Sequence, residues 1–157
     1  MKKIIILFSI LIPIVLGVSR KDVLDFTLNQ YKKVSQTLQT GTQYPYHGKP
    51  ESKTWGVGGP ASFEAGMYPG VLWQLYRYTQ EDWTLNLAIQ ATDGMYMDQY
   101  IKNTHDIGFM IDNSYGLGYD FTQNFTYFEY IVNAANHLSL RYSGMKNMNL
   151  VSFWKLN

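Results

Sequence analysis

The chain has 157 residues, of which 46% are hydrophobic, 16% aromatic and 16% charged. This composition excludes a disordered polar chain and predicts a single domain with a hydrophobic core. Thirteen Lys and Arg against 12 Asp and Glu give a formal net charge of +1, which provides no electrostatic basis for binding nucleic acid. Because cysteine is absent, disulfides, thiolate metal ligands and a thiol nucleophile are excluded.

The N-terminus has the pattern of a secretory signal peptide. Lys2 and Lys3 precede a nearly unbroken apolar run over residues 4–16, and the small residues Gly17 and Ser19 follow. A membrane anchor is the alternative, but a helix of this length spans only about 20 Å, against about 30 Å for a bilayer core. We therefore expect residues 1–19 to be a signal peptide cleaved after Gly17 or Ser19. The mature protein is then secreted or otherwise extracytoplasmic, lysosomal in a eukaryotic host, and free of the membrane.

The remaining sequence is expected to be all-α. Apolar residues spaced three and four apart predict five amphipathic helices, over residues 23–38, 69–79, 80–100, 108–119 and 124–142. Asp22 is expected to cap the first helix, and Thr79 the third. Pro69 suits the first turn of the second helix, and Gly144 is expected to stop the fifth.

Residues 40–60 are expected to form a long loop that carries Trp55. They contain three prolines and no alternating pattern of apolar and polar residues, so no strand is predicted there.

Two helix junctions have similar sequences, because Thr-Gln follows an aromatic residue at positions 78–80 and again at 121–123. The similarity predicts two antiparallel helical hairpins of one kind. Repeated hairpins bury their faces against neighbours, and a ring of them closes into a toroid. The chain has too few hairpins to close such a ring.

The strongest chemical candidate is Asp106, which follows His105 and enters an apolar segment over residues 107–111. A carboxyl group beside apolar side chains is poorly solvated in its charged form, so it is suited to carrying a proton as a general acid or base. The alternative is that Asp106 only caps the following helix through its free amides. His47 and His137 are too isolated to complete a metal site, so neither a metal nor another cofactor is assigned.

A second candidate is a group of aromatic residues around the start of the second predicted helix. A hollow formed by Trp55, Phe63, Tyr68, Phe109 and Tyr115 would offer flat apolar faces with polar rims to a sugar ring. The alternative for these rings is ordinary core packing.

Three sequence blocks resemble, in family order, those of glycoside hydrolase family 88, the unsaturated glucuronyl hydrolases. The blocks are MYPGVLWQLYRYT at 67–79, THDIGFM at 104–110 and SYGLGY at 114–119. The second block is the most specific of the three. The resemblance covers residues 23–143 and implies an (α/α)6 toroid of six hairpins. It also implies an enzyme that hydrates the C4=C5 double bond of a terminal unsaturated uronic acid and thereby releases it from lyase-generated oligosaccharides.

The resemblance also implies roles for individual residues. Asp106 matches the first of the family's two essential aspartates, and His105 matches an imidazole that lines the subsite of the unsaturated sugar. Phe63 stands where many members have tryptophan, and Tyr68 lies in the first matching block, so both are expected to contact substrate.

The family's second aspartate lies roughly 60 residues after the His-Asp pair, beyond Asn157. We therefore expect residues 20–157 to be the N-terminal part of an (α/α)6 catalytic domain that is inactive by itself. Its expected partners are unsaturated uronic-acid oligosaccharides of the glycosaminoglycan type. A non-catalytic carbohydrate-binding or interaction module is the alternative, and an unstable remnant with uncovered apolar helix faces is a third possibility.

Overall fold

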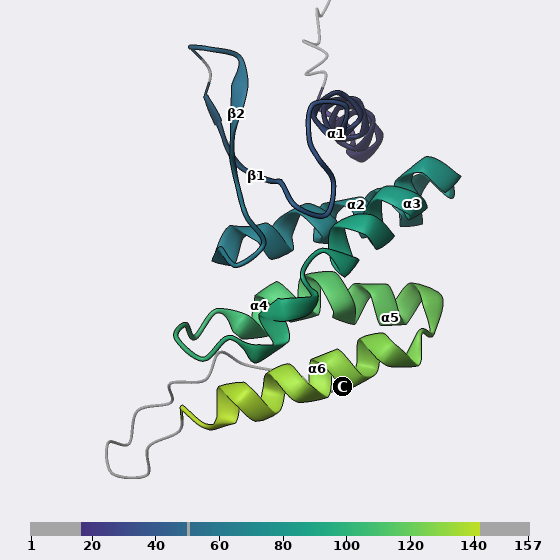
Figure 1. Ribbon diagram of the computed structural model, residues 1–157. Helices are drawn as coiled ribbons and strands as arrows, with labels where there is room; N and C mark the ends of the chain where they lie inside the picture. Colours follow the sequence, from purple (N-terminus) through teal and green to yellow (C-terminus); the bar gives the residue numbers. More distant parts are fainter. Residues whose placement is uncertain (1–16, 50, 142–157) are drawn as a thin grey trace, which may run out of the picture.

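The computed structural model describes residues 17–49 and 51–141. Two antiparallel helical hairpins lie one on the other, and a further helix and a β-hairpin cover the first of them (Figure 1). The elements in chain order are α1 Arg20–Ser35, β1 Tyr44–Lys49, β2 Thr54–Gly58, the 3-10 helix η1 Phe63–Gly66, α2 Met67–Thr79, α3 Asp82–Asp93, the 3-10 helix η2 Tyr96–Tyr100, α4 Ile107–Ile111, the π-helical turn η3 Asp112–Gly116, α5 Leu117–Thr122 and α6 Phe125–Ser139. The predominance of helix agrees with the sequence.

The first helix begins earlier than predicted, because its cap is Ser19 rather than Asp22. The Ser19 hydroxyl accepts a hydrogen bond from the Asp22 amide at 3.1 Å, and the Asp22 carboxylate accepts one from the Ser19 amide at 3.0 Å. This reciprocal arrangement is a capping box, which satisfies two amides that would otherwise lack partners. Asp22 therefore contributes to the cap from the third helical position.

The prediction that residues 40–60 contain no strand is wrong. β1 and β2 pair antiparallel, with an irregular register between Pro45 and His47. Proline is tolerated here because both strands of a two-stranded sheet are edges, so a missing amide donor breaks no central ladder. Tyr44 anchors the hairpin to the helices, because its buried hydroxyl donates to the Ala91 carbonyl at 2.7 Å.

The two helix junctions have the same geometry, which confirms the predicted repeat. Gln80 ends α2 at φ 56°, and Gln123 ends α5 at φ 55°, both in the left-handed region. Each Gln side-chain amide donates back to two carbonyls of the helix that it ends. The preceding residues, Thr79 and Thr122, each accept a hydrogen bond from the backbone amide two residues later. Thr79 therefore braces the turn, while Glu81 occupies the cap position of α3.

Two predicted helices are divided in the structure. The segment predicted as residues 80–100 breaks at Gly94, where a Cβ atom would lie 2.0 Å from the Gly41 carbonyl oxygen. The approach of the Gly41 loop therefore requires a glycine there. The segment predicted as residues 108–119 is α4 and α5 joined through the π-helical turn η3. The fifth predicted helix, at residues 124–142, is α6, and Gly144 lies outside the described residues.

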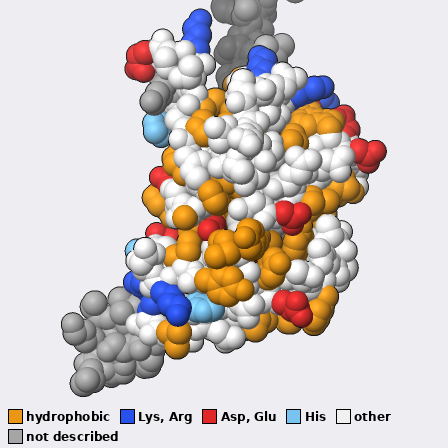
Figure 2. All heavy atoms as spheres, viewed as in Figure 1, with side chains coloured by type: hydrophobic (Ala, Val, Ile, Leu, Met, Phe, Trp, Pro, Cys, Tyr) orange, Lys and Arg blue, Asp and Glu red, His pale blue; other side chains and the backbone are white. Residues whose placement is uncertain are grey.

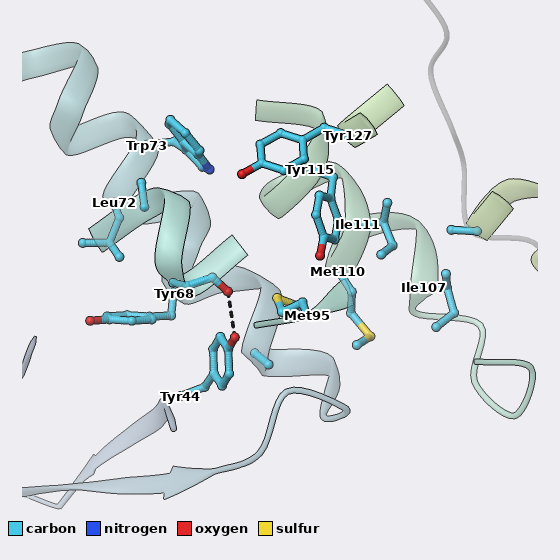
Figure 3. Close-up of a cluster of buried hydrophobic side chains, with 14 of the residues drawn as sticks. Tyr44, Tyr68, Leu72, Trp73, Met95, Ile107, Met110, Ile111, Tyr115 and Tyr127 are labelled. Carbon is cyan, nitrogen blue, oxygen red and sulfur yellow. Dashed lines mark hydrogen bonds between the residues drawn. The ribbon is translucent and has the colours of Figure 1, made fainter. Parts of the chain in front are cut away.

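Aromatic and aliphatic side chains from both hairpins form the core (Figure 3). Trp73 of α2 is fully buried, and its ring stacks on Phe121 of α5 with 5.6 Å between centroids. The Trp73 indole N–H donates to the Thr92 hydroxyl at 3.0 Å. Tyr115 meets Tyr127 edge to face at 5.2 Å. The Trp73–Phe121 contact joins the two hairpins, while the other two contacts hold together the helices within each hairpin.

The last helix is apolar on two sides. One side packs into the core through Tyr127, Ala134 and Leu138. The other carries Phe125 and Val132, which are exposed and line a hollow of about 410 Å³ where η2 meets α6. Figure 2 shows hydrophobic side chains gathered in this region. None of the described helices is both long and apolar enough to cross a bilayer.

A buried carboxyl group in η2 makes the stability of the fold depend on pH. Asp98 is only 2% exposed, and among the described residues its Oδ2 has no hydrogen-bond partner. Burial raises the pKa of Asp98 from 3.8 to about 7. The folded state therefore holds this proton more tightly than the unfolded state does. The contribution of Asp98 to the free energy of unfolding is greatest below about pH 4 and falls as the pH rises to 7.

We expect Asp98→Asn to melt at a higher temperature than the parent protein at pH 8 and at a similar temperature at pH 4. The amide has nearly the shape of the carboxyl but gains no charge as the pH rises. Thermal unfolding followed by circular dichroism between pH 4 and 8 measures the difference. The exposed Glu129→Gln is the control and should follow the parent. Equal pH dependence of Asp98→Asn and the parent would contradict this assignment.

Candidate active site

The candidate site lies where two parallel helices begin. α2 and the α4–α5 segment run in the same direction, so their N-terminal ends lie at one end of the molecule (Figure 1). η1 leads into α2 and packs against α4, because a Cβ atom at Gly66 would lie 2.6 Å from the Met110 Cα atom. Only glycine permits this approach of one backbone to the other. The entry segments of the two hairpins are therefore neighbours.

Asp106 stands at the cap position of α4, but its side chain makes no capping hydrogen bond. Its Oδ2 instead accepts a hydrogen bond from the Thr104 hydroxyl at 2.8 Å. The same hydroxyl accepts the Asp106 backbone amide at 3.2 Å. Thr104 thus fixes the direction of the carboxylate. The alternative that Asp106 serves only as a helix cap is not supported by these contacts.

His105 and Asp106 form an acid and imidazole pair at the surface. The His105 Nε2 lies 3.3 Å from the Asp106 Oδ1, and the two side chains are 67% and 20% exposed. The carboxyl group is thus mostly covered yet reachable from one side, while the imidazole extends outward. A carboxyl and an imidazole in contact can hold and transfer a proton.

The loop that carries this pair is tied to the end of α6. Arg141 Nη1 donates to the Lys102 carbonyl at 2.7 Å, across 39 residues of sequence. The C-terminal end of α6 therefore supports the segment that leads into His105 and Asp106.

Phe63 lies on the neighbouring entry segment, η1, and is 49% exposed. Its ring is therefore available to a ligand.

Asn113 and Met67, which the sequence did not single out, lie between the hairpins. The Asn113 amide donates to the Phe109 carbonyl at 2.9 Å and contacts the Met67 sulfur at 3.7 Å. Asn113 follows Asp106 by seven residues, which places both near one side of a helix. That spacing was the available signal for Asn113.

The five aromatic residues predicted to form one hollow do not come together. Tyr68 is 1% exposed, and its ring stacks on Tyr31 of α1 with 5.8 Å between centroids. Tyr115 is fully buried in the core, and Trp55 lines a separate groove beside α1. A buried ring offers no face to a sugar, so we leave Tyr68 out of the proposed site. The helical period explains the difference, because Tyr68 faces α1 while its neighbour Met67 is exposed.

The described residues contain no group of three or more His, Asp or Glu side chains placed to hold a metal ion. His137 is engaged locally, because its Nδ1 lies 2.8 Å from the Asn133 carbonyl oxygen. His47 lies on the β-hairpin beside Gly56, where an added Cβ atom would contact the His47 ring. The titratable side chains described at the candidate site are the carboxyl group of Asp106 and the imidazole of His105.

The fold is similar to that of a solved glycosidase. The structure of an unsaturated glucuronyl hydrolase specific for heparin superposes with a TM-score of 0.72 and 29% sequence identity, over 79% of this chain and 33% of that one. No family model matches the chain, and no curated protein does. The similarity confirms the predicted fold class, in which helical hairpins form part of an (α/α)6 toroid. This chain spans about a third of the length of that hydrolase.

The contact at Gly66 provides a test of how the site is assembled. We expect Gly66→Ala to lower the free energy of unfolding by about 2 kcal/mol, because the new methyl group must displace the backbone at Met110. Gly59→Ala is the matched control, since a Cβ atom there meets nothing within 4 Å. Urea unfolding measures both. Equal stability of the two variants would show that η1 and α4 do not approach as described.

Proposed function

We propose that this chain is part of a glycosidase of the unsaturated glucuronyl hydrolase type, which acts on oligosaccharides ending in an unsaturated uronic acid. The observation that supports the proposal is the His105–Asp106 pair, together with the exposed ring of Phe63 on the neighbouring entry segment η1. This pair lies at the entry of the second hairpin, in a fold that is similar to that of a heparin-specific unsaturated glucuronyl hydrolase.

The proposed reaction is hydration of the C4=C5 double bond. A carboxylic acid donates a proton to C4 while a water oxygen bonds to C5, and a base accepts the proton that the water loses. The resulting hemiketal opens and releases the rest of the oligosaccharide. Because no bond is made at the anomeric carbon, the chemistry needs only proton transfer between positioned groups.

In this proposal Asp106 is the base that accepts the proton of the water. Thr104 holds its Oδ2, which leaves the Oδ1 side, next to His105, for water and substrate. The outward imidazole of His105 contacts the uronic acid, and the ring of Phe63 packs against a sugar face. The proton donor is a second carboxyl group, which we propose is supplied by residues that follow Asn157 in the whole enzyme.

The requirement for two carboxyl groups predicts that the 157 residues alone do not turn over substrate. Incubation with an unsaturated chondroitin disaccharide should leave the ultraviolet absorbance of the double bond unchanged. A steady decrease that depends on the protein would contradict the need for a second carboxyl group.

A chimera tests the role of Asp106 directly. This chain would replace the matching third of the heparin-specific hydrolase, so that the rest of that enzyme completes the toroid. We expect Asp106→Asn to lower kcat of the chimera by about 10²- to 10⁴-fold, the usual contribution of general acid or base catalysis. Asp120→Asn, an exposed change in α5, should leave kcat within about twofold. Full activity of the Asp106→Asn chimera would refute the proposed role. Saccharide binding by a folded but inactive parent chimera would favour the non-catalytic module instead.

We also propose that the protein is exported, although residues 1–16 lie outside the described part. The Ser19 capping box supports a preference for one of the two predicted cleavage positions. Cleavage after Ser19 would remove the cap, at a cost of about 1 kcal/mol of helix stability, whereas cleavage after Gly17 retains it. We therefore expect the mature protein to begin at Val18, as read by mass spectrometry of the secreted protein. A mature protein that begins at Arg20 would contradict this.

A further inference from the structure

A groove between α1 and the β-hairpin has the chemistry of a saccharide site and plays no part in the proposed reaction. Its volume is about 430 Å³. The apolar part includes Trp55 and Val57 of β2, and the polar part includes Gln30, Lys33 and Lys53. α1 and the hairpin lie on the opposite side of α2 from α4, which follows the His105–Asp106 pair (Figure 1).

The exposed side chain of Trp55 indicates that the ligand has a flat face. It is 40% exposed, whereas Trp73, in the core, is fully buried. An exposed indole beside another apolar side chain provides a surface on which the face of a sugar ring can pack. The strand also holds the ring in place, because Trp55 pairs with Gly48 in the hairpin ladder.

The two lysines of the groove indicate that the ligand is anionic. Within the described residues neither Lys33 nor Lys53 forms a salt bridge, although both are exposed. Their neighbours on α1 are engaged differently, since Lys21 pairs with Asp25 and Lys32 lies over the ring of Trp83. Lys33 and Lys53 therefore bring two uncompensated cations to the same groove.

The distribution of charge along the sequence supports the same conclusion. Residues 20–53, which include α1 and β1, contain six Lys and Arg against three Asp and Glu. Residues 54–157 contain five Lys and Arg against nine Asp and Glu. Figure 2 shows several basic side chains at the end formed by α1 and the hairpin. Although the net charge of the whole chain is near zero, the end formed by α1 and the β-hairpin is basic and therefore attracts polyanions.

We propose that the groove between α1 and the β-hairpin binds an acidic oligosaccharide, with Trp55 packing on a sugar ring and Lys33 and Lys53 pairing with its carboxylate or sulfate groups. The choice of a saccharide among polyanions rests on the proposed function. The groove is a second contact, distant from the reacting sugar, that holds a polymeric substrate on the protein.

Titration calorimetry of a heparin hexasaccharide binding to the full-length protein tests the proposal. We expect Trp55→Ala to weaken binding about tenfold through loss of the stacking surface. Lys33→Gln with Lys53→Gln should also weaken it about tenfold and reduce its salt dependence. Lys32→Gln with Lys102→Gln removes the same charge outside the groove and should change the affinity less than about twofold. Circular dichroism melts confirm that each variant is folded.

Two further ligands and one further variant separate the alternatives. Neutral cellohexaose should bind at least about tenfold more weakly than the heparin hexasaccharide, because it lacks anions. A 12-residue oligothymidine that binds as tightly as heparin would overturn the saccharide assignment. Equal loss of affinity in both lysine double variants would overturn the groove as the site. The test compares binding by groove variants only, so failure of the proposed catalytic role of Asp106 leaves it intact.

Discussion

The stacking of Trp73 on Phe121 is the contact on which the arrangement of the two hairpins depends. The indole belongs to the first hairpin and the phenyl ring to the second, so their burial is lost unless the hairpins meet in one orientation. The indole N–H also needs the Thr92 hydroxyl, because a buried donor without a partner is costly. Apolar burial thus supplies the free energy, and this hydrogen bond fixes the rotation of the ring.

This packing brings the functional residues to one end of the molecule. Because α2 and α4 run parallel, their entry segments meet, and the absence of a side chain at Gly66 allows direct backbone contact. Phe63 precedes the glycine by three residues, and Asp106 precedes Met110 by four. The aromatic ring and the carboxyl group therefore come from different hairpins but are positioned by a single contact. The Arg141 tether at Lys102 adds support from α6.

Much of this organisation could be predicted from sequence, because helical periodicity and turn chemistry are local signals. The Thr-Gln junctions predicted a repeat, and the two turns have nearly identical geometry. The strands of the β-hairpin were missed because three prolines and the lack of an alternating pattern argued against strands, although an edge strand tolerates Pro45. The environment of Tyr68 was also missed, since α1 determines which side of α2 is covered and a single sequence does not specify how helices pack. Asp106 was found through a motif, whereas the Thr104 contact that orients it depends on a local backbone conformation that the motif does not specify.

The repeated turns at Gln80 and Gln123 have a consequence for how the protein acquires its structure. Each turn is closed by groups within a few residues of one another, through the glutamine amide and the preceding threonine hydroxyl. Contacts of such short sequence separation carry little loop-closure entropy and form early. Each pair of helices can therefore assemble while later residues are still being synthesised on the ribosome. The slower step is the packing of the two completed helical hairpins against each other, which brings Trp73 into contact with Phe121.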